Sequence, residues 1–470
     1  MEQVIATGNR AGTGMRAVGP WQRAIACQRD GDREGAICWI ERHLSRETED
    51  IGAWMHLGTL LRQAARADAA LVCYQRALRL CPRDATIWNN LGKLWPELGQ
   101  HEQGLRAHRR AVELDPARLG LRVDCAAALR DACRIDEAEA MLSSCLRAEP
   151  GWRDVRHERA LLRLQAGRYR EGWEDYAARN PSGLARAVAL RLPRWQGERI
   201  AGRRLLLTEE GDEAAILWAA RYIGMLIRRG ALPTLVLRDS LHAAFAGAPF
   251  RVVSPDALPQ AIEQADLHCP LPDLPRCVDP RGVAIPAPFE VAVAVSGNAA
   301  LQERLAGPAP GLRVGFCREA GEGSREWPRA AFLLTTMMGL ALLPGLQLCT
   351  LCWGARNEAP GPAAGGLLTE LEPLIHGLED TIHALRSLDL LVTVDGPLAH
   401  LAAGLGVPVL NLLPFCPAWT WGLRGDTTPW YPTMRLLRQS APGDWEAVST
   451  ELRALLRAWA GSHRRASGGT

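Results

Sequence analysis

The sequence predicts an array of paired helices followed by an α/β region with two parallel sheets. Small and apolar residues recur every 34 residues from Ile51, which is the period of a repeated helical hairpin. After Pro193 this period ends, and short β-rich apolar runs alternate with helical stretches. Such runs are typical of parallel strands that are buried on both faces. The chain has 470 residues and is long enough for several cores.

The helical repeat is read from two successive units, Ile51–Asp84 and Ala85–Arg118. The same positions hold similar residues in both: Trp54 and Trp88, Leu57 and Leu91, Gly58 and Gly92, Leu61 and Trp95, Ala70 and Gly104, Tyr74 and His108, Ala77 and Ala111, Pro82 and Pro116. A third unit, Leu119–Trp152, keeps part of the pattern, and a degenerate unit precedes Ile51. Small residues at the helix crossing, large residues between the helices and a closing proline are what stacked helical hairpins require.

These positions resemble the tetratricopeptide repeat (TPR) family over residues 17–180, including a divergent last unit. The resemblance implies a helical solenoid whose concave face holds a protein partner or an acceptor. The alternative is that so few repeats dock onto the second half as a structural collar. Residues 1–16 are expected to be a disordered N-terminus.

Composition excludes several classes of protein. Hydrophobic residues make up 47% and charged residues 23%, as in ordinary globular proteins. The net charge of +3 is small and spread along the chain, so no nucleic-acid partner is predicted. Thirteen scattered cysteines indicate reduced thiols, and the pair Cys349 and Cys352 lies in an expected buried strand, which favours core packing over metal binding. No apolar run reaches signal-peptide or membrane-spanning length, so a cytoplasmic protein is expected.

The α/β region is expected to form two Rossmann-like, doubly wound lobes, over residues 195–304 and 305–460, followed by a disordered tail over 461–470. A Pro-rich stretch from Pro270 to Pro288 places the boundary between the lobes near residue 305. The expected strands are Arg204–Thr208, Thr234–Leu237, Arg251–Val253, Leu312–Phe316, Leu346–Leu351, Leu390–Val394 and Val409–Leu413. In such sheets the ligand lies beyond the carboxyl ends of the strands, here in the cleft between the lobes.

One strand-to-helix turn carries the features of an anion site. The strand Leu390–Val394 ends in Asp395 and Gly396, and a helix starts at Pro397, a favoured first position. Backbone amides at this start, including those of Leu398 and Ala399, together with the helix dipole suit a diphosphate. His400 follows one turn later, within reach of a phosphate or ribose. Taken singly, an Asp here is usually a helix cap and a helical His is usually packing.

The segment 376–446 resembles the heptosyltransferase-like glycosyltransferases. The matching motifs are Asp380–Thr381, Asp395 with Ala399–His400–Leu401–Ala402, Leu412–Leu413–Pro414–Phe415, Pro429–Trp430–Tyr431–Pro432–Thr433–Met434–Arg435 and Gly443–Asp444–Trp445. The resemblance implies a GT-B fold and a metal-independent, inverting transfer of a sugar from a nucleotide diphosphate, which is a substrate; no cofactor is expected. It assigns the donor diphosphate to Asp395, Gly396 and His400. Trp419, Trp421, Trp430 and Tyr431 are candidates to stack on a base or sugar, although packing is the commoner role of such rings.

A second turn supplies the candidate catalytic residue. The first strand of the α/β region runs into Glu209–Glu210–Gly211–Asp212 and then a helix. In the resembled enzymes, a Gly-Asp at this turn carries the carboxylate that deprotonates the acceptor hydroxyl, and Asp212 matches it. A carboxylate facing the cleft can act as general base while the opposite lobe stabilises the departing diphosphate.

The sequence departs from the family pattern in three loops. The glycine-rich lead before Asp212 is shortened, and Ala418 and Thr420 replace the residues usual around Trp419. After the strand Leu312–Phe316, Arg318 and Arg325 are possible substitutes for the usual phosphate-holding run.

Two functions therefore compete: a glycosyltransferase, and a non-catalytic interaction scaffold with an inert or nucleotide-binding α/β platform. An open cleft that Asp212 and His400 both face would favour the enzyme. A cleft filled by side chains would favour the scaffold. A dinucleotide-dependent reductase is disfavoured, because no G-x-G-x-x-G follows the first strand. The nucleotide, the sugar, the acceptor and the oligomeric state are not indicated.

Overall fold

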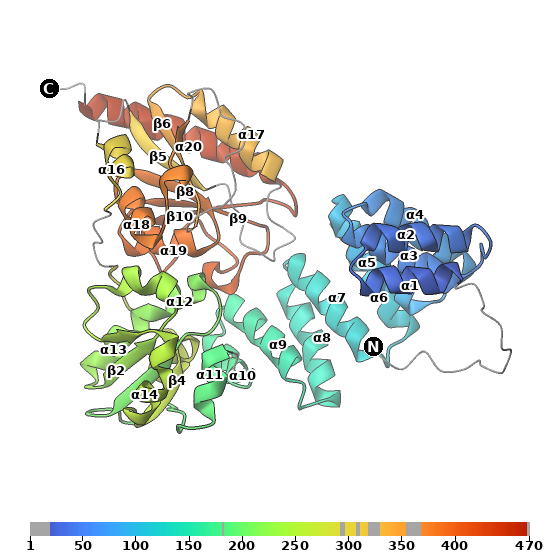
Figure 1. Ribbon diagram of the computed structural model, residues 1–470, viewed down its shortest axis with the longest axis horizontal. Helices are drawn as coiled ribbons and strands as arrows, with labels where there is room; N and C mark the ends of the chain where they lie inside the picture. The colour runs from blue at the N-terminus through green and yellow to red at the C-terminus, as the bar shows by residue number, and fades with distance from the viewer. Residues whose placement is uncertain are drawn as a thin grey trace. The chain divides into compact units, whose positions relative to one another are not determined.

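The computed structural model describes residues 19–180, 183–291, 297–306, 311–317, 330–353 and 368–467 (Figure 1). The chain forms two compact units, Met1–Ala128 and Leu129–Thr470, so the boundary falls within helix α7 (Leu119–Asp131). The first unit is helical, and the second contains further repeat helices and both sheets.

The first unit is built from antiparallel helical hairpins, and in two of them, α3–α4 and α5–α6, a glycine lies where the helices cross. A Cβ on Gly58 would lie 2.6 Å from the Tyr74 ring, and one on Gly92 would lie 2.6 Å from the His108 ring. The glycines therefore let the second helix of each of these two hairpins press its ring against the first. The helices before α7 are α1 (Pro20–Arg29), α2 (Arg33–Leu44), α3 (Ile51–Gln63), α4 (Ala67–Leu80), α5 (Ala85–Leu94), the 3-10 turn η1 (Trp95–Leu98) and α6 (His101–Leu114).

A residue with left-handed backbone recurs at the turn inside every hairpin. These residues are Gly31, Ala65, Gly99, Cys133 and Gly167, with φ of 79°, 57°, 76°, 57° and 76°. They are spaced by the 34-residue period, and they extend the register into both the degenerate first unit and the divergent last one. The predicted TPR-type repeats are thus present through helix α10.

The last repeat helices belong to the second unit and pack against its α/β part. These helices are α8 (Ile135–Ala148), α9 (Arg153–Gln165) and α10 (Tyr169–Tyr176), followed by α11 (Gly183–Ala189). Trp173 of α10 stacks against Trp218 with ring centroids 6.3 Å apart. Gln165 at the end of α9 donates a hydrogen bond to the Pro417 carbonyl, at 2.5 Å. These contacts dock this part of the array onto the α/β body.

The first sheet has four parallel strands in the order β3-β2-β1-β4. The strands are β1 (Arg204–Thr208), β2 (Leu232–Val236), β3 (Arg251–Val253) and β4 (Leu267–Pro270). Leu205 and Leu207 of β1 pack toward α12 (Glu213–Ala219) and α13 (Ile223–Arg228), whereas Leu206 packs toward α11 and α14 (Leu258–Glu263). Strand β4, which lies beside β1, was not predicted. Shorter elements are η2 (Ala220–Tyr222), η3 (Asp239–Phe245), η4 (Pro255–Ala257), η5 (Leu271–Asp273) and α15 (Leu274–Val278).

The second sheet has six parallel strands in the order β10-β9-β8-β5-β6-β7, which is the doubly wound order. The strands are β5 (Leu312–Cys317), β6 (Leu346–Leu351), β7 (Thr369–Glu370), β8 (Leu390–Val394), β9 (Val409–Leu413) and β10 (Met434–Arg438). Strands β7 and β10 were not predicted. Cys349 and Cys352 are fully buried in or beside β6, as core packing requires.

Helices cover both faces of this sheet (Figure 1). Leu390, Val392 and Val394 of β8 pack against α17 (Ala330–Ala341) and α20 (Trp445–Ser467), and Leu391 faces the opposite layer. That layer contains α16 (Ala299–Leu305), α18 (Leu378–Arg386) and α19 (Pro397–Gly404), and η6 (Glu372–Leu374) and η7 (Trp419–Trp421) complete the region.

Both ends of the second lobe differ from the prediction. Asn298, just before α16, donates a hydrogen bond to the Leu374 carbonyl at 2.6 Å, so the second lobe takes in residues before 305. Helix α20 continues to Ser467, although a disordered tail was predicted from 461.

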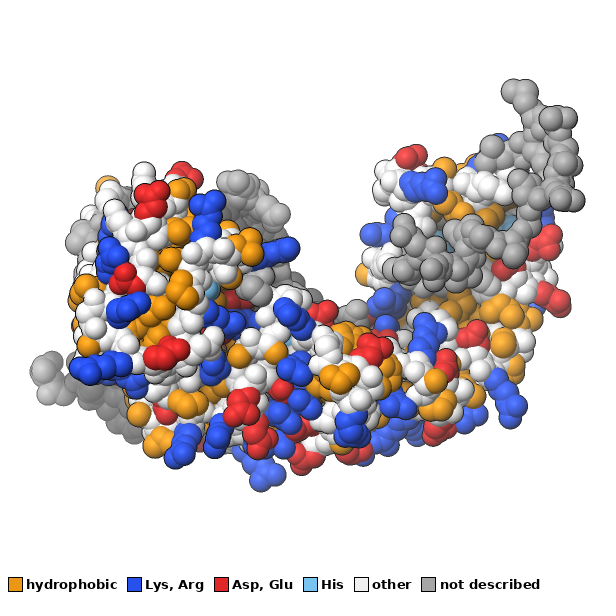
Figure 2. All heavy atoms as spheres, turned by 90° about the horizontal axis from the view of Figure 1, so that it is seen from below, with side chains coloured by type: hydrophobic (Ala, Val, Ile, Leu, Met, Phe, Trp, Pro, Cys, Tyr) orange, Lys and Arg blue, Asp and Glu red, His pale blue; other side chains and the backbone are white. Residues whose placement is uncertain are grey.

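The surface is mixed in charge. On the face in Figure 2, acidic and basic side chains are interspersed, in keeping with the small net charge. No described helix has the length and apolar character that crossing a bilayer requires.

Candidate active site at the junction of the two sheets

The structure places the two predicted turns at equivalent points of the two sheets. Asp212 follows β1, next to β4, where the strand order of the first sheet reverses. Asp395 follows β8, next to β5, where the order of the second sheet reverses. Doubly wound sheets bind their ligands at these switch points, beyond the carboxyl ends of the strands. Helices α12 and α19, which start at the two turns, contact each other.

Asp212 stands apart from the other carboxylates of its turn. Three of the four acidic residues between 209 and 213 are held by arginines: Glu209 and Glu213 by Arg238, at 3.0 and 2.9 Å, and Glu210 by Arg179, at 2.5 Å. Asp212 is exposed, and its side chain accepts one hydrogen bond, from the Ala215 amide at 2.8 Å. Among the described residues it has no ion-pair partner. It is therefore a solvated carboxylate at the start of α12.

Asp395 is in a different environment. Its side chain is 15% exposed, and it accepts a hydrogen bond from the Gly396 amide. Burial raises the pKa of Asp395 to about 6, and the negative charge of Asp212 acts in the same direction. The charge of Asp212 acts on Asp395, and helices α12 and α19, which start at the two turns, contact each other. Asp212 remains accessible and Asp395 is poised to titrate near neutral pH.

The start of α19 leaves space beside Asp395. A Cβ added to Gly396 would meet no atom within 4 Å, and no side chain caps the helix at this residue. The side chains of Leu398 and Ala399 are buried, and the Ala399 amide donates to the Gly396 carbonyl at 3.1 Å. The turn therefore offers open room at Gly396 rather than deeper along the helix.

His400 lies inside the protein. Its ring stacks on Trp421 with centroids 5.1 Å apart, and its Nδ1 lies 2.8 Å from the Tyr431 hydroxyl. Burial, together with the Arg221 charge, lowers the pKa of His400 to about 3, so the imidazole is neutral. Its Nε2 lies 4.0 Å from a carboxylate oxygen of Asp395. In this conformation His400 faces side chains and not an open cleft, and its predicted contact with a donor stays a prediction.

Three of the four aromatic side chains proposed for stacking are also buried, and Trp419 is partly buried. Trp421, Trp430 and Tyr431 are 2–3% exposed. Trp430 meets Trp218 edge-on at 5.2 Å, and Tyr431 meets His400 edge-on at 5.5 Å. Their role in this conformation is packing, the alternative raised by the sequence.

Arg221 is a site residue that sequence reasoning missed. It lies on η2, directly after α12, and is 3% exposed. Its guanidinium donates to the Trp430 carbonyl at 2.8 Å and lies 4.5 Å from the centre of the Tyr431 ring. A cationic side chain of the first lobe is thus buried against the second lobe. The available signal was a single arginine within the otherwise apolar run ILWAARYIGML.

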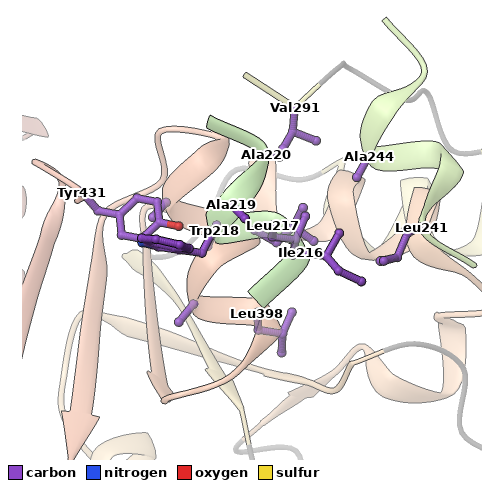
Figure 3. Close-up of a cluster of buried hydrophobic side chains, with 14 of the residues drawn as sticks. Ile216, Leu217, Trp218, Ala219, Ala220, Leu241, Ala244, Val291, Leu398 and Tyr431 are labelled. Atoms are coloured by element: carbon purple, nitrogen blue, oxygen red, sulfur yellow. The ribbon is translucent and has the colours of Figure 1, made fainter. Parts of the chain in front are cut away.

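Apolar side chains fill the contact between the lobes (Figure 3). Ile216 and Leu217 of α12 belong to the same buried cluster as Leu398 of α19. This cluster continues without a break from the first sheet to the second lobe. The junction therefore contains a closed, packed part around His400 and an accessible part around Asp212 and Gly396. Arg318 and Arg325 lie outside the described residues.

Fold and site together define a TPR-containing protein with an α/β body of two parallel sheets. The family model for the TPR repeat matches residues 58–95. Over 490 aligned residues the chain is 24% identical to protein FlbA of Caulobacter vibrioides, across 92% of this chain and 74% of that protein.

Solved structures also match part of the chain. MamA from Desulfovibrio magneticus RS-1 is 14% identical, with a TM-score of 0.31, over 33% of this chain and 87% of that one. PilW, a type IV pilus biogenesis factor, is 22% identical, with a TM-score of 0.31, over 34% and 75%. TM-scores this low support no inference about this chain.

Proposed function

We propose that this protein is a glycosyltransferase that moves a sugar from a nucleotide-diphosphate donor to an acceptor, with the TPR repeats holding the acceptor or a protein partner. The observation that carries the proposal is the carboxylate pair. Asp212 lacks an ion pair among the described residues, and it lies at the carboxyl end of one sheet near Asp395, at the carboxyl end of the other. Carboxylates in unlike environments at a switch point are a common arrangement in catalysis.

In this proposal Asp212 is the general base. It removes the proton of the acceptor hydroxyl, and the oxygen then attacks the anomeric carbon in line with the bond to the diphosphate. That bond breaks, the nucleotide diphosphate departs and the configuration at the anomeric carbon is inverted. The dipole at the start of α19 and the Leu398 amide stabilise the negative charge that develops on the leaving group. Asp395, when protonated, donates a hydrogen bond to the donor instead of repelling its phosphates.

The test begins with nucleotide binding. Calorimetric titration with UDP, GDP and ADP is expected to show one nucleotide that binds more tightly at pH 6 than at pH 8, because protonation of Asp395 removes a repulsive charge. Asp395→Asn should abolish this pH dependence. Failure of all three nucleotides to bind at either pH would overturn the donor site.

Catalysis is tested separately. The matching nucleotide-sugar is incubated with the protein, and release of the nucleotide diphosphate is measured. Asp212→Asn should lower the rate by about 10²–10⁴-fold while nucleotide binding is retained. Glu213→Gln, one residue away but paired with Arg238, is the control and should change the rate little. Equal rates for the two variants would remove Asp212 from the mechanism.

A second function is favoured by the burial of His400. If the junction stays as closed as it is here, the α/β body is a platform and the repeats alone act, by binding a protein. An inert platform gives no heat with any nucleotide and no change in Tm on adding one. A platform that only binds nucleotide gives heat but releases no nucleotide diphosphate from the nucleotide-sugar in the presence of an acceptor.

A further inference from the structure

A pair of cysteine side chains joins the repeats to the second lobe. Cys133 lies in the turn between α7 and α8, and Cys416 lies in the segment between β9 and η7. Cys133 lies against the segment that holds Cys416, and the Cys416 thiol lowers the pKa of Cys133. The Cys133 sulfur lies 3.8 Å from the Phe415 carbonyl, and Gln165 donates to the Cys416 sulfur at 3.2 Å. Both cysteines are partly exposed.

We propose that Cys133 and Cys416 form an oxidisable dithiol that peroxide converts into a disulfide between the repeat array and the second lobe. This inference goes beyond the proposed function and does not depend on it. The pairing joins positions 283 residues apart in sequence, so it exists only because the last repeats pack on the α/β body.

The surroundings favour reaction at Cys133. The Cys416 thiol lowers the pKa of Cys133 to about 7, and the nearby Arg438 guanidinium acts in the same direction. A thiolate is the reactive form of cysteine, and partly exposed thiols beside cationic groups are the ones that oxidise. Arg130 interacts electrostatically with Cys416 and is a second cation beside the two thiols.

The chemistry balances with hydrogen peroxide as the oxidant. The Cys133 thiolate attacks one peroxide oxygen, the O–O bond breaks, and Cys133 becomes a sulfenic acid while one water leaves after protonation. The Cys416 sulfur then attacks the Cys133 sulfur, the S–O bond breaks and a second water leaves. The two thiols together lose two electrons, and the peroxide is reduced to two waters.

The disulfide would fasten a segment that covers the candidate site. Cys416 lies three residues before η7, whose Trp421 stacks on His400. A covalent bond at Cys416 ties this segment to the turn at Cys133 and restricts movement of the ring over His400. Oxidation is therefore expected to slow hydrogen exchange in residues 414–422.

The chain holds a matched control. Cys269 and Cys277 likewise shift each other's pKa, but they are 0% and 7% exposed, so peroxide cannot reach them readily. The full-length protein is treated with hydrogen peroxide, blocked with an alkylating agent and mapped by mass spectrometry without reduction. A Cys133–Cys416 disulfide is expected, with Cys269 and Cys277 alkylated only after unfolding.

Variants isolate the two steps. In Cys416→Ser the disulfide cannot form, and dimedone should trap a sulfenic acid on Cys133. In Cys133→Gly, which suits the left-handed backbone there and should fold, Cys416 should react no faster than the exposed Cys38. The proposal is overturned if Cys133 in the wild-type protein is oxidised no faster than Cys38, or if the two cysteines are found in disulfides with other partners.

Discussion

Asp395 is a carboxyl group whose environment disfavours its charged form. Its pKa is raised to about 6 in the folded protein, from about 4 in an unfolded chain. The folded state therefore binds the proton more tightly than the unfolded state between these values. Stability from this group is fully present below about pH 4 and is lost as the pH rises through 6, at a cost of up to about 3 kcal/mol.

Asp395→Asn should remove this loss. The variant is expected to match the wild-type protein at pH 4 and to exceed its free energy of unfolding by about 2–3 kcal/mol at pH 8, because the amide has no charge to bury. Guanidinium denaturation at the two pH values measures the difference. Asp426→Asn, at a well exposed carboxylate, is the control. A gain that is equal at both pH values would contradict the assignment.

Ala65 occupies a left-handed backbone position that holds glycine in three of the five hairpins. A left-handed conformation costs a non-glycine residue roughly 1–2 kcal/mol, of which part is returned by the smaller entropy of the unfolded chain. Ala65→Gly is therefore expected to stabilise the protein by about 0.5–1 kcal/mol, read as an increase in Tm. Ala64→Gly, where φ is −86°, should lower the Tm instead.

At the scale of elements, two TPR hairpins depend on a glycine packed against a ring, Gly58 against Tyr74 and Gly92 against His108. Gly92→Ala would place a methyl group 2.6 Å from the His108 ring, which is itself held by a 2.8 Å hydrogen bond to Asn89. Overpacking of this kind should destabilise the protein by about 1–3 kcal/mol. Thermal denaturation followed by circular dichroism measures it.

Gly120 in α7 provides the control for the Gly92→Ala prediction. A Cβ there would meet no atom within 4 Å. Gly120→Ala should stabilise the protein by about 0.5–1 kcal/mol, because alanine loses less conformational entropy in a helix. Similar effects for the two glycine substitutions would show that helix propensity, and not the close contact with His108, sets the outcome.

The three strands that were not predicted, β4, β7 and β10, all lie at the edges of their sheets, where the apolar pattern of a strand is weaker. Strand β4 ends in Pro270, which reads as a break, and β7 has two residues, too few for a pattern. Strand β10 carries Arg435 and Arg438 and lies at the sheet edge, so it lacks the apolar run of a central strand. The seven predicted strands were mostly central ones, where burial on both faces leaves a clear signal.

At the scale of the molecule, the packed junction between α12 and α19 should make the two sheets unfold together. Leu398→Ala removes a buried side chain there and is expected to cost about 2–5 kcal/mol and to split the calorimetric transition of the second unit in two. Leu232→Ala, at a residue 58% exposed, is the control and should leave the transition single. A single transition in Leu398→Ala would mean that other contacts couple the sheets.

The sequence by itself determined the repeats, most strands of the sheets and the turns at Asp212 and Asp395. These depend on local patterns: a 34-residue period, buried apolar runs and residues suited to helix starts. The tertiary structure decided which side chains meet. It buried His400 against Tyr431, placed Arg221 in hydrogen-bond contact with the Trp430 carbonyl and placed Cys133 beside the segment that holds Cys416. Burial and charge proximity depend on the packing of segments far apart in the chain, which no local pattern records.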